Sequence, residues 1–399
     1  MLRASIEEQE RALRSSLVLN PVENFPFPED IAVAGSALHG LYNTDKVRAR
    51  EERLATPLQF GGRQALESDS QAVYSAWATA LGAAEVTMRI LSGLHAHTTL
   101  FMAMAQPEQS VLLLPVEAGG HLSGRAILER LGLEIFDLPV DREAMCVDVP
   151  AALELCEESV PDYVFVDRSE GLVFEDFSRL ARIEGATTIF DASQYLTNVI
   201  CGPHSNPFEW GFDLMVASVH KNFPGPQKAL LASRRDDSRW RTLLKGVSTY
   251  VSNMHVASTY AAGLTLTRSA WLHDYSNRML DTAVALEDAL GESGVPVVTR
   301  PRDLPPTHHV WVAERSRERA YDTYEALERC GIMVNFRLLP YGLGYGIRIG
   351  TAAAARLGLE LADVPALADL IASIRRRGAA QPLRQEVARF SADLWARAP

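Results

Sequence analysis

Short apolar runs alternate with longer stretches of helical periodicity through the middle of the chain. Residues 110–115, 163–167, 188–191 and 214–218 are rich in aliphatic, β-branched and aromatic side chains, which is typical of buried strands. Helices are expected between them, after a long helix over residues 68–81. This alternation favours an α/β domain with a mostly parallel sheet flanked by helices. Such sheets bind ligands at the carboxyl ends of their strands.

The N-terminal residues follow a different pattern. Residues 3–17 are strongly charged but carry Ile6 and Leu13 on one side, which predicts an amphipathic helix. The prolines of residues 20–28 end it, because proline removes backbone donors and fixes the backbone. We therefore expect an N-terminal arm over residues 1–30.

The C-terminal third becomes helical from residue 264 to about 290, which places a domain boundary inside or just after that helix. Beyond it we expect strands at 296–299, 310–313 and 347–349, a helix over 316–329 capped by Ser316, and two more helices. The prediction is a large domain over residues 31–275 and a smaller C-terminal α+β domain over residues 276–399.

Composition narrows the classes of partner. The chain has 399 residues, of which 47% are hydrophobic, enough for a substantial core. Its formal charge of −11 disfavours nonspecific binding to nucleic acid or to an anionic membrane. We expect a small-molecule partner.

The four cysteines are scattered and lack the spacing of a metal site, namely Cys146, Cys156, Cys201 and Cys330. We predict free thiols in a reducing cytoplasm and no metal. The N-terminus has no apolar core like that of a signal peptide, and no run approaches the ~20 apolar residues of a membrane span.

A lysine and an aspartate stand at the ends of two predicted strands. Lys221 follows the strand at 214–218, and Asp191 ends the strand before it. Taken singly, such an aspartate is often a helix cap and such a lysine is usually solvated. Their order and spacing favour pyridoxal phosphate (PLP), because the lysine can form an imine with its aldehyde and the aspartate can keep its ring nitrogen protonated.

The lysine segment resembles that of a known family. Ser218-Val219-His220-Lys221 followed by Gly225-Pro226 is similar to the corresponding segment of serine hydroxymethyltransferases, which are PLP enzymes with the aspartate-aminotransferase fold (fold type I). Further matches occur in the same order at 23–25, 60–62, 92–93, 119–124, Asp191 and 346–351. The resemblance covers about residues 20–360 and implies a seven-stranded type of mostly parallel sheet.

The resemblance also implies which residues hold the cofactor. Ser92, Gly93 and Leu94 begin a helix whose N-terminus would bind the phosphate, although Leu94 replaces a family serine. Ser169 and Gln194 would lie beside the phenolic oxygen, where Gln194 replaces a family histidine. The remaining cofactor-binding residues that it implies are Ser218, His220 and Tyr42, the last reaching the phosphate from the other subunit of a homodimer with shared active sites.

The proposed catalytic residues are Lys221, Asp191, His121 and Arg348. His121 would stack on the cofactor ring and relay protons, where the ordinary alternative is a loop histidine. Arg348 would bind the carboxylate of an amino acid substrate with its planar fork, where the alternative is a surface arginine on a strand.

The residues that differ from the family pattern are those expected on the side of the site where the substrate and folate would bind. The family carries a glutamate two residues after its tyrosine, and this chain has Thr44, whose hydroxyl cannot do the same acid and base work near neutral pH. Asp45 could replace it only if the loop shifts. Val22, Gln59 and Phe60 replace other polar family residues.

These losses lead to a functional hypothesis. We expect a PLP enzyme acting on a non-serine L-α-amino acid by β-elimination, or by decarboxylation with oxidative deamination, in a natural-product pathway. The alternative is an aldol-type enzyme, meaning a threonine aldolase, a transaldolase or a glycine hydroxymethyltransferase. A noncatalytic relative is disfavoured because Lys221, Asp191 and Arg348 are present, and an aminotransferase because the motifs belong to the hydroxymethyltransferase branch.

Overall fold

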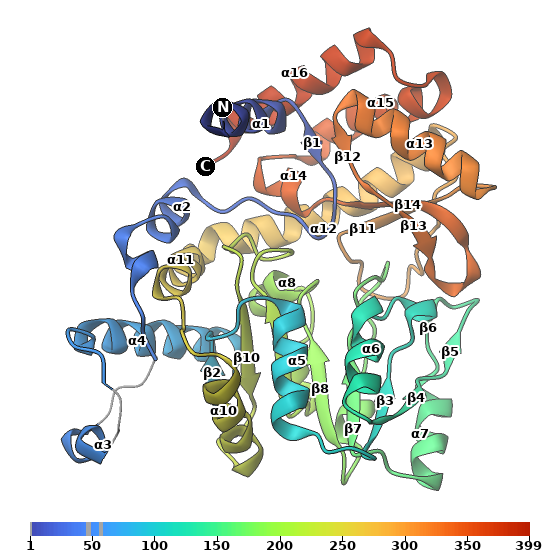
Figure 1. The fold of residues 1–399 in the computed structure, drawn as a ribbon. Helices are drawn as coiled ribbons and strands as arrows, with labels where there is room; N and C mark the ends of the chain where they lie inside the picture. Colours follow the sequence, from blue (N-terminus) through green and yellow to red (C-terminus); the bar gives the residue numbers. More distant parts are fainter. Residues whose placement is uncertain (1, 45–48, 56–58) are drawn as a thin grey trace.

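The computed structural model describes residues 2–44, 49–55 and 59–399. In Figure 1 a sheet domain lies below and a C-terminal lobe above, with helix α12 (Ser269–Glu292) running between them. The arrangement matters for function because the carboxyl ends of the central strands face the lobe.

The large domain is built on a seven-stranded sheet in the order β2-β10-β9-β8-β7-β3-β4. Only β10 runs antiparallel to its neighbours. The strands are β2 (Glu85–Thr87), β3 (Ser110–Leu113), β4 (Glu134–Asp137), β7 (Tyr163–Val166), β8 (Thr187–Asp191), β9 (Leu214–Ser218) and β10 (Ala229–Ser233). The predicted α/β class with a mostly parallel sheet is confirmed.

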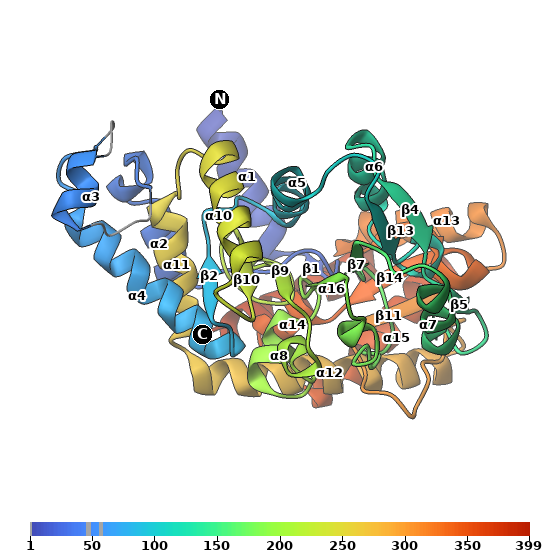
Figure 2. The ribbon, with the colours of Figure 1, turned by 90° about the horizontal axis from the view of Figure 1, so that it is seen from below.

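Successive residues of each central strand enter two different cores. In β8, Ile189 packs into the core that contains α5 and α10, whereas Phe190 packs into the core that contains α8 and α12. These helix pairs lie on opposite sides of the sheet (Figure 2). Burial on both faces explains why the strands appear in the sequence as continuous apolar runs rather than as alternating ones.

The helices of the large domain are α2 (Pro28–Ala34), α3 (Arg50–Ala55), α4 (Gln64–Leu81), α5 (Gly93–Met104), α6 (Leu122–Arg130), α7 (Val149–Glu158), α8 (Leu196–Cys201), α9 (Pro207–Trp210), α10 (Ser238–Tyr250) and α11 (Val256–Leu266). A small hairpin of β5 (Val140–Asp141) and β6 (Cys146–Val147) lies beside them.

The C-terminal lobe has an antiparallel sheet in the order β11-β14-β13. Its strands are β11 (His309–Ala313), β13 (Asn335–Leu339) and β14 (Gly344–Gly350), and its helices are α13 (Arg317–Cys330), α14 (Ala352–Arg356), α15 (Val364–Arg377) and α16 (Gln381–Arg397).

The N-terminal residues join this lobe. Strand β1 (Leu17–Val18) pairs in parallel with β12 (Ile332–Met333), and Leu17 and Leu19 are buried in the core of the lobe. Helix α1 (Leu2–Arg14) lies beside α16 (Figure 1). The division into residues 1–30, 31–275 and 276–399 remains a prediction.

Two local expectations were wrong and one strand was missed. Residues 296–299 form no strand and contribute a single bridge between Val297 and Val312, because the two prolines and glycine nearby keep this segment a loop. Strand β13 was not expected. The helix expected over 264–290 is two helices, since α11 ends at Leu266 and α12 begins at Ser269. Ser316 does cap α13, where its hydroxyl accepts from the Arg319 amide.

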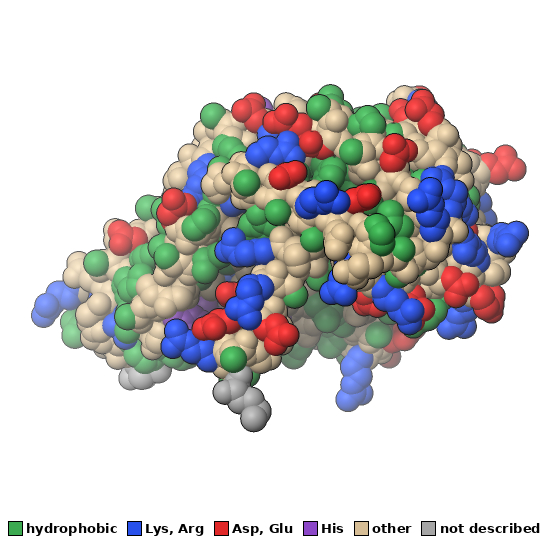
Figure 3. Space-filling view, turned by 90° about the horizontal axis from the view of Figure 1, so that it is seen from above, with side chains coloured by type: hydrophobic (Ala, Val, Ile, Leu, Met, Phe, Trp, Pro, Cys, Tyr) green, Lys and Arg blue, Asp and Glu red, His purple; other side chains and the backbone are tan. Residues whose placement is uncertain are grey.

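The surface seen from above mixes charges of both signs without a broad basic patch on that face (Figure 3). None of the helices in the described ranges is both long and apolar enough to cross a bilayer. All four cysteines are free, as predicted.

Candidate active site

A narrow cleft at the carboxyl ends of β7, β8 and β9 gathers most of the predicted residues. Its lining is Gly93, Leu94, His97, His121, Asp167, Arg168, Ser169, Asp191, Ser193, Gln194 and Lys221. Seven of these were predicted from the sequence. Five predicted residues are not among the described residues that line it. Of these, Ser92, Ser218 and His220 lie next to lining residues. Tyr42 and Arg348 belong to segments of the chain that contribute no lining residue.

Lys221 follows β9 by three residues and is half-buried. Its ammonium makes no hydrogen bond or ion pair with any residue that the structure describes, although its carbonyl accepts from the Asn24 amide over 2.6 Å. The neighbouring His220 directs Nδ1 at the Lys228 carbonyl over 3.2 Å. A half-buried amine without a partner suits a residue that binds a ligand covalently.

Asp191 is fixed through both of its carboxylate oxygens. Oδ1 accepts from the Ser193 amide over 2.6 Å, and Oδ2 lies 2.6 Å from Nε2 of His97. Burial raises the pKa of Asp191, but the hydrogen bond and charge of His97 outweigh it, so the pKa falls below its usual value. Asp191 is therefore ionised in a buried position, as a partner for a pyridinium nitrogen requires.

His97 was missed by the sequence analysis. It lies one turn of α5 after Gly93, so the spacing of four residues places both on the same helix face. That spacing was a usable signal, but His97 has no counterpart in the motifs that carried the resemblance.

His121 is neutral near pH 7, because burial lowers its pKa to about 4. Its Nδ1 accepts from the Ser123 amide over 3.2 Å, which leaves the proton on Nε2. The ring lies 5.9 Å from the His97 ring at 87°. His121 can thus offer a flat neutral face and an Nε2–H donor.

At the start of α5 the backbone lies very close to the side chain of Ser218. Ser92 caps the helix by accepting from the His95 amide, so its hydroxyl is engaged. A Cβ on Gly93 would lie 2.5 Å from Oγ of Ser218, which leaves no room for a side chain there. Leu94 is exposed. The free amides of the first turn remain as donors for a phosphate.

Gln194 offers a donor at the expected position. Its Oε1 faces Nε2 of His309 over 3.4 Å, while its Nε2 is buried without a described partner. An unsatisfied buried amide is costly unless a ligand pairs with it. Together with Asp191, Lys221 and the start of α5, this donor fits pyridoxal phosphate.

Arg348 lies on β14 and is not among the described residues that line the cleft. Its Nε and Nη2 donate to Oδ1 of Asn335 over 3.2 and 2.7 Å, and its Nη1 lies 3.5 Å from Glu170. Glu170 is fully buried and also pairs with Arg337. Neither Glu170 nor Asn335 was expected from the sequence. Burial lowers the pKa of Arg348 to about 10, which leaves it charged near neutral pH.

Tyr42 packs on Phe60 with ring centroids 4.7 Å apart, and its carbonyl accepts from Nε of Arg63 over 2.8 Å. The amide of Thr44 donates to Oδ1 of Asn43. Asp45, the possible substitute for the family glutamate, lies outside the described residues. The contribution of Tyr42 to a second subunit's site remains a prediction.

His97, His121 and Asp167 offer ligand atoms within 4.8 Å of one another, a set that could surround a metal ion. The sequence analysis expected no metal. A metal requires neutral imidazoles, whereas the two aspartates raise the pKa of His97 despite its burial. The arrangement is better described as an imidazole between two carboxyl groups, because His97 bonds to Asp191 over 2.6 Å and lies 3.7 Å from Asp167.

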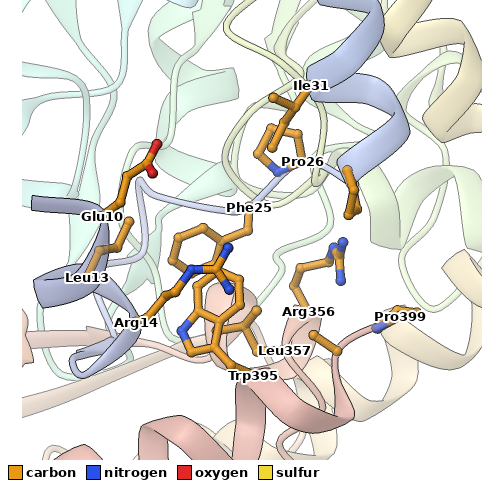
Figure 4. A pocket seen from close by; sticks show the side chains of 12 residues that line it. Glu10, Leu13, Arg14, Phe25, Pro26, Ile31, Arg356, Leu357, Trp395 and Pro399 are labelled. Carbon is orange, nitrogen blue, oxygen red and sulfur yellow. The ribbon is translucent and has the colours of Figure 1, made fainter. Parts of the chain in front are cut away.

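A larger cavity of about 510 Å³ lies elsewhere, between α1, α2 and α16. Phe25, Trp395 and Leu13 give it apolar walls, and Arg14 and Arg356 line it as well (Figure 4). It shares no lining residue with the Lys221 cleft. It is therefore separate from the candidate active site.

Comparison with known proteins agrees with the family resemblance found in the sequence. A family model described as serine hydroxymethyltransferase matches residues 2–371. A serine hydroxymethyltransferase of Pyrobaculum calidifontis is 31% identical over 343 residues, which cover 83% of this chain and 80% of that protein.

Two further similar proteins are named transaldolases. A fluorothreonine transaldolase of Streptantibioticus cattleyicolor is 32% identical over 297 residues, which cover 73% of this chain and 46% of that protein. The crystal structure of L-threonine transaldolase from Pseudomonas fluorescens superposes with a TM-score of 0.92, covering 100% of this chain and 92% of the other at 22% identity. At that identity the likeness shows the fold.

Proposed function

Since this chain belongs to the serine hydroxymethyltransferase family, we propose that it is a transaldolase acting on a β-hydroxy-α-amino acid such as L-threonine. At the coarser level it is a PLP-dependent enzyme of the transferase or aldolase type. In the proposed reaction the Cα–Cβ bond breaks, an aldehyde leaves, and the glycine unit adds to a second aldehyde. Atoms and electrons balance without an oxidant.

The observation that carries this proposal is Thr44 in the position of the family glutamate. Transfer of a one-carbon unit with folate needs an acid there, whereas exchange of one aldehyde for another does not. The name of the Streptantibioticus cattleyicolor relative supports the same choice. The β-elimination and oxidative outcomes remain untested predictions, as does a natural-product pathway.

Each proposed residue has a role set by its surroundings. PLP, when bound, supplies an electron-accepting ring that lowers the barrier to breaking a bond at Cα. Lys221 would hold the cofactor and move protons, Asp191 would pair with the ring nitrogen, and Gln194 would donate to the phenolic oxygen. His121, which is neutral near pH 7, would stack on the ring.

Arg348 is proposed to bind the substrate carboxylate. Two of its nitrogens are fixed on Asn335, so the guanidinium has a defined orientation and its charge is retained. Glu170 faces the remaining nitrogen, and a substrate carboxylate has to compete with it for Arg348.

The test compares products from three incubations of the loaded enzyme and follows oxygen uptake in each. L-Threonine with a second aldehyde should give acetaldehyde and a new β-hydroxy amino acid. L-Serine with tetrahydrofolate should give little glycine. Pyruvate or ammonia from a cysteine S-conjugate, or oxygen uptake with any substrate, would instead establish elimination or oxidation and contradict the proposal.

A separate measurement tests the link to the cofactor. Borohydride reduction of the loaded protein should place a pyridoxyl group on Lys221, and Lys221→Ala should remain unlabelled. A label elsewhere would overturn the assignment of Lys221 independently of the reaction.

We further propose a homodimer in which Tyr42 serves the partner's site. The support is that Tyr42 is not among the described lining residues of its own cleft. Mixing inactive Lys221→Ala with inactive Tyr42→Ala should restore part of the activity, because one mixed site then has both residues. No restoration in a mixture shown to exchange subunits would contradict sharing.

A further inference from the structure

His97 lies between two buried aspartates at the base of the cleft. Its side chain is 3% exposed, with Nε2 2.6 Å from Asp191 and Nδ1 3.7 Å from Asp167. The three residues come from α5, from the end of β8 and from the position after β7. Their approach is therefore fixed by the packing of the sheet and not by a flexible loop.

Four titratable groups face the His97 ring. Asp191 is an anion, Asp167 is a carboxyl group whose pKa burial raises to about 7, Lys221 is a cation, and His121 is a neutral ring near pH 7. Burial and Lys221 disfavour a charged imidazole, but the two carboxylates together outweigh them. The pKa of His97 is thus raised above its usual value, which favours the charged form of a ring held between two buried carboxyl groups.

We propose that His97 is a positioning residue that fixes Asp191 as an ionised carboxylate toward the cofactor's ring nitrogen, with Asp167 as a second carboxyl group beside it. The Ser193 amide already holds one oxygen of Asp191, and His97 holds the other. With both oxygens anchored the carboxylate cannot turn, yet each oxygen keeps a lone pair for a further donor.

The charge of His97 has a second consequence. A cation beside the cofactor disfavours protonation of the bound cofactor, because like charges repel in a buried site. Removal of this cation should therefore let the protonated form of the bound cofactor persist to higher pH. A histidine with a merely structural role would not produce this shift.

The experiment uses two variants of the loaded enzyme. His97→Gln keeps a donor for Asp191 but removes the charge, and His97→Phe removes both. The matched control is His204→Gln, a buried histidine that bonds to the Pro306 carbonyl and does not line the cleft. The readouts are the dissociation constant for pyridoxal phosphate and the pH midpoint of its absorption band.

Both His97 variants should raise the midpoint by about one unit or more. His97→Phe should weaken cofactor binding roughly tenfold or more, and His97→Gln by no more than roughly threefold. If His97→Phe does not fold, the midpoint of His97→Gln decides. An unchanged midpoint in His97→Gln, or an equal shift in His204→Gln, would overturn the inference.

The inference rests on the proposed role of Asp191 and holds whichever bond of the substrate is broken. Asp191→Asn distinguishes the two failures. Cofactor binding unchanged in Asp191→Asn would overturn both proposals. Weakened binding there, combined with wild-type behaviour of both His97 variants, would overturn only the role of His97.

Discussion

The side-chain amide of Asn24 donates to the carbonyl of Lys221 over 2.6 Å, although 197 positions separate the two residues. The same amide lies 2.9 Å from the Tyr275 hydroxyl, which itself donates to the carbonyl of Asn222. The backbone that carries the lysine is therefore held by the N-terminal segment and by α12. The orientation of Lys221 therefore depends on contacts made by residues outside the central sheet, although the lysine follows strand β9 of that sheet.

Asn24→Ala should therefore disturb the lysine turn. It leaves part-buried acceptors without their donor, and we expect a loss of about 1–3 kcal/mol in the free energy of unfolding, together with weaker cofactor binding. Urea unfolding and cofactor titration measure the two effects. The control is Asn20→Ala, whose side chain accepts from the Val22 amide and bonds to Glu23, away from the lysine turn. Equal losses in both variants would contradict a specific role for Asn24.

Gly93→Ala tests the close approach at the start of α5. The new Cβ would meet Ser218 Oγ at 2.5 Å, so we expect cofactor affinity to fall roughly tenfold or more through displacement of this turn. The double variant Gly93→Ala with Ser218→Ala should recover part of the affinity, since it removes the clashing hydroxyl. Gly40→Ala has open space around it and serves as control. Absence of any recovery would contradict the steric explanation.

The sequence predicted the parallel strands well, because burial on both faces of the sheet produces continuous apolar runs. The candidate site residues could be predicted too, because they stand at or just after the carboxyl ends of those runs. Asp191 and Lys221 were found in this way. His97 and Asp167 were missed since they have no distinctive local sequence, and only the packing of α5 against two strand ends brings them together. Likewise, Glu170 meets Arg348 through a contact between domains that no local pattern encodes.

Arg348→Lys tests carboxylate binding. Lysine keeps the charge but loses the planar fork that Asn335 orients, so we expect KM for the amino acid to rise roughly tenfold or more, with cofactor affinity unchanged. Steady-state kinetics and cofactor titration measure both. Arg337→Lys is the control, because Arg337 shares the partner Glu170 but lies on β13. A rise of KM only in the control would transfer the role to Arg337.

Acid should destabilise the fold through its buried histidines. His204 stacks on Phe174 at 4.3 Å, donates from Nε2 to Pro306, and burial lowers its pKa to about 4. Because the unfolded state then binds the proton first, its contribution to stability is complete above about pH 6.5 and is lost as the pH falls toward 4. The loss from this one residue should reach about 3 kcal/mol.

His204→Phe keeps the stacked ring and removes the titrating group. It should be less stable than the wild type at pH 7.5, where the bond to Pro306 is lost, but its stability should fall less steeply between pH 6.5 and 4.5. Urea unfolding across this range measures the slope. His39→Phe changes an exposed histidine and should leave the slope unchanged. Parallel curves for wild type and His204→Phe would show that His204 does not take up a proton on unfolding, because an imidazole that is equally protonated in both states contributes no pH dependence.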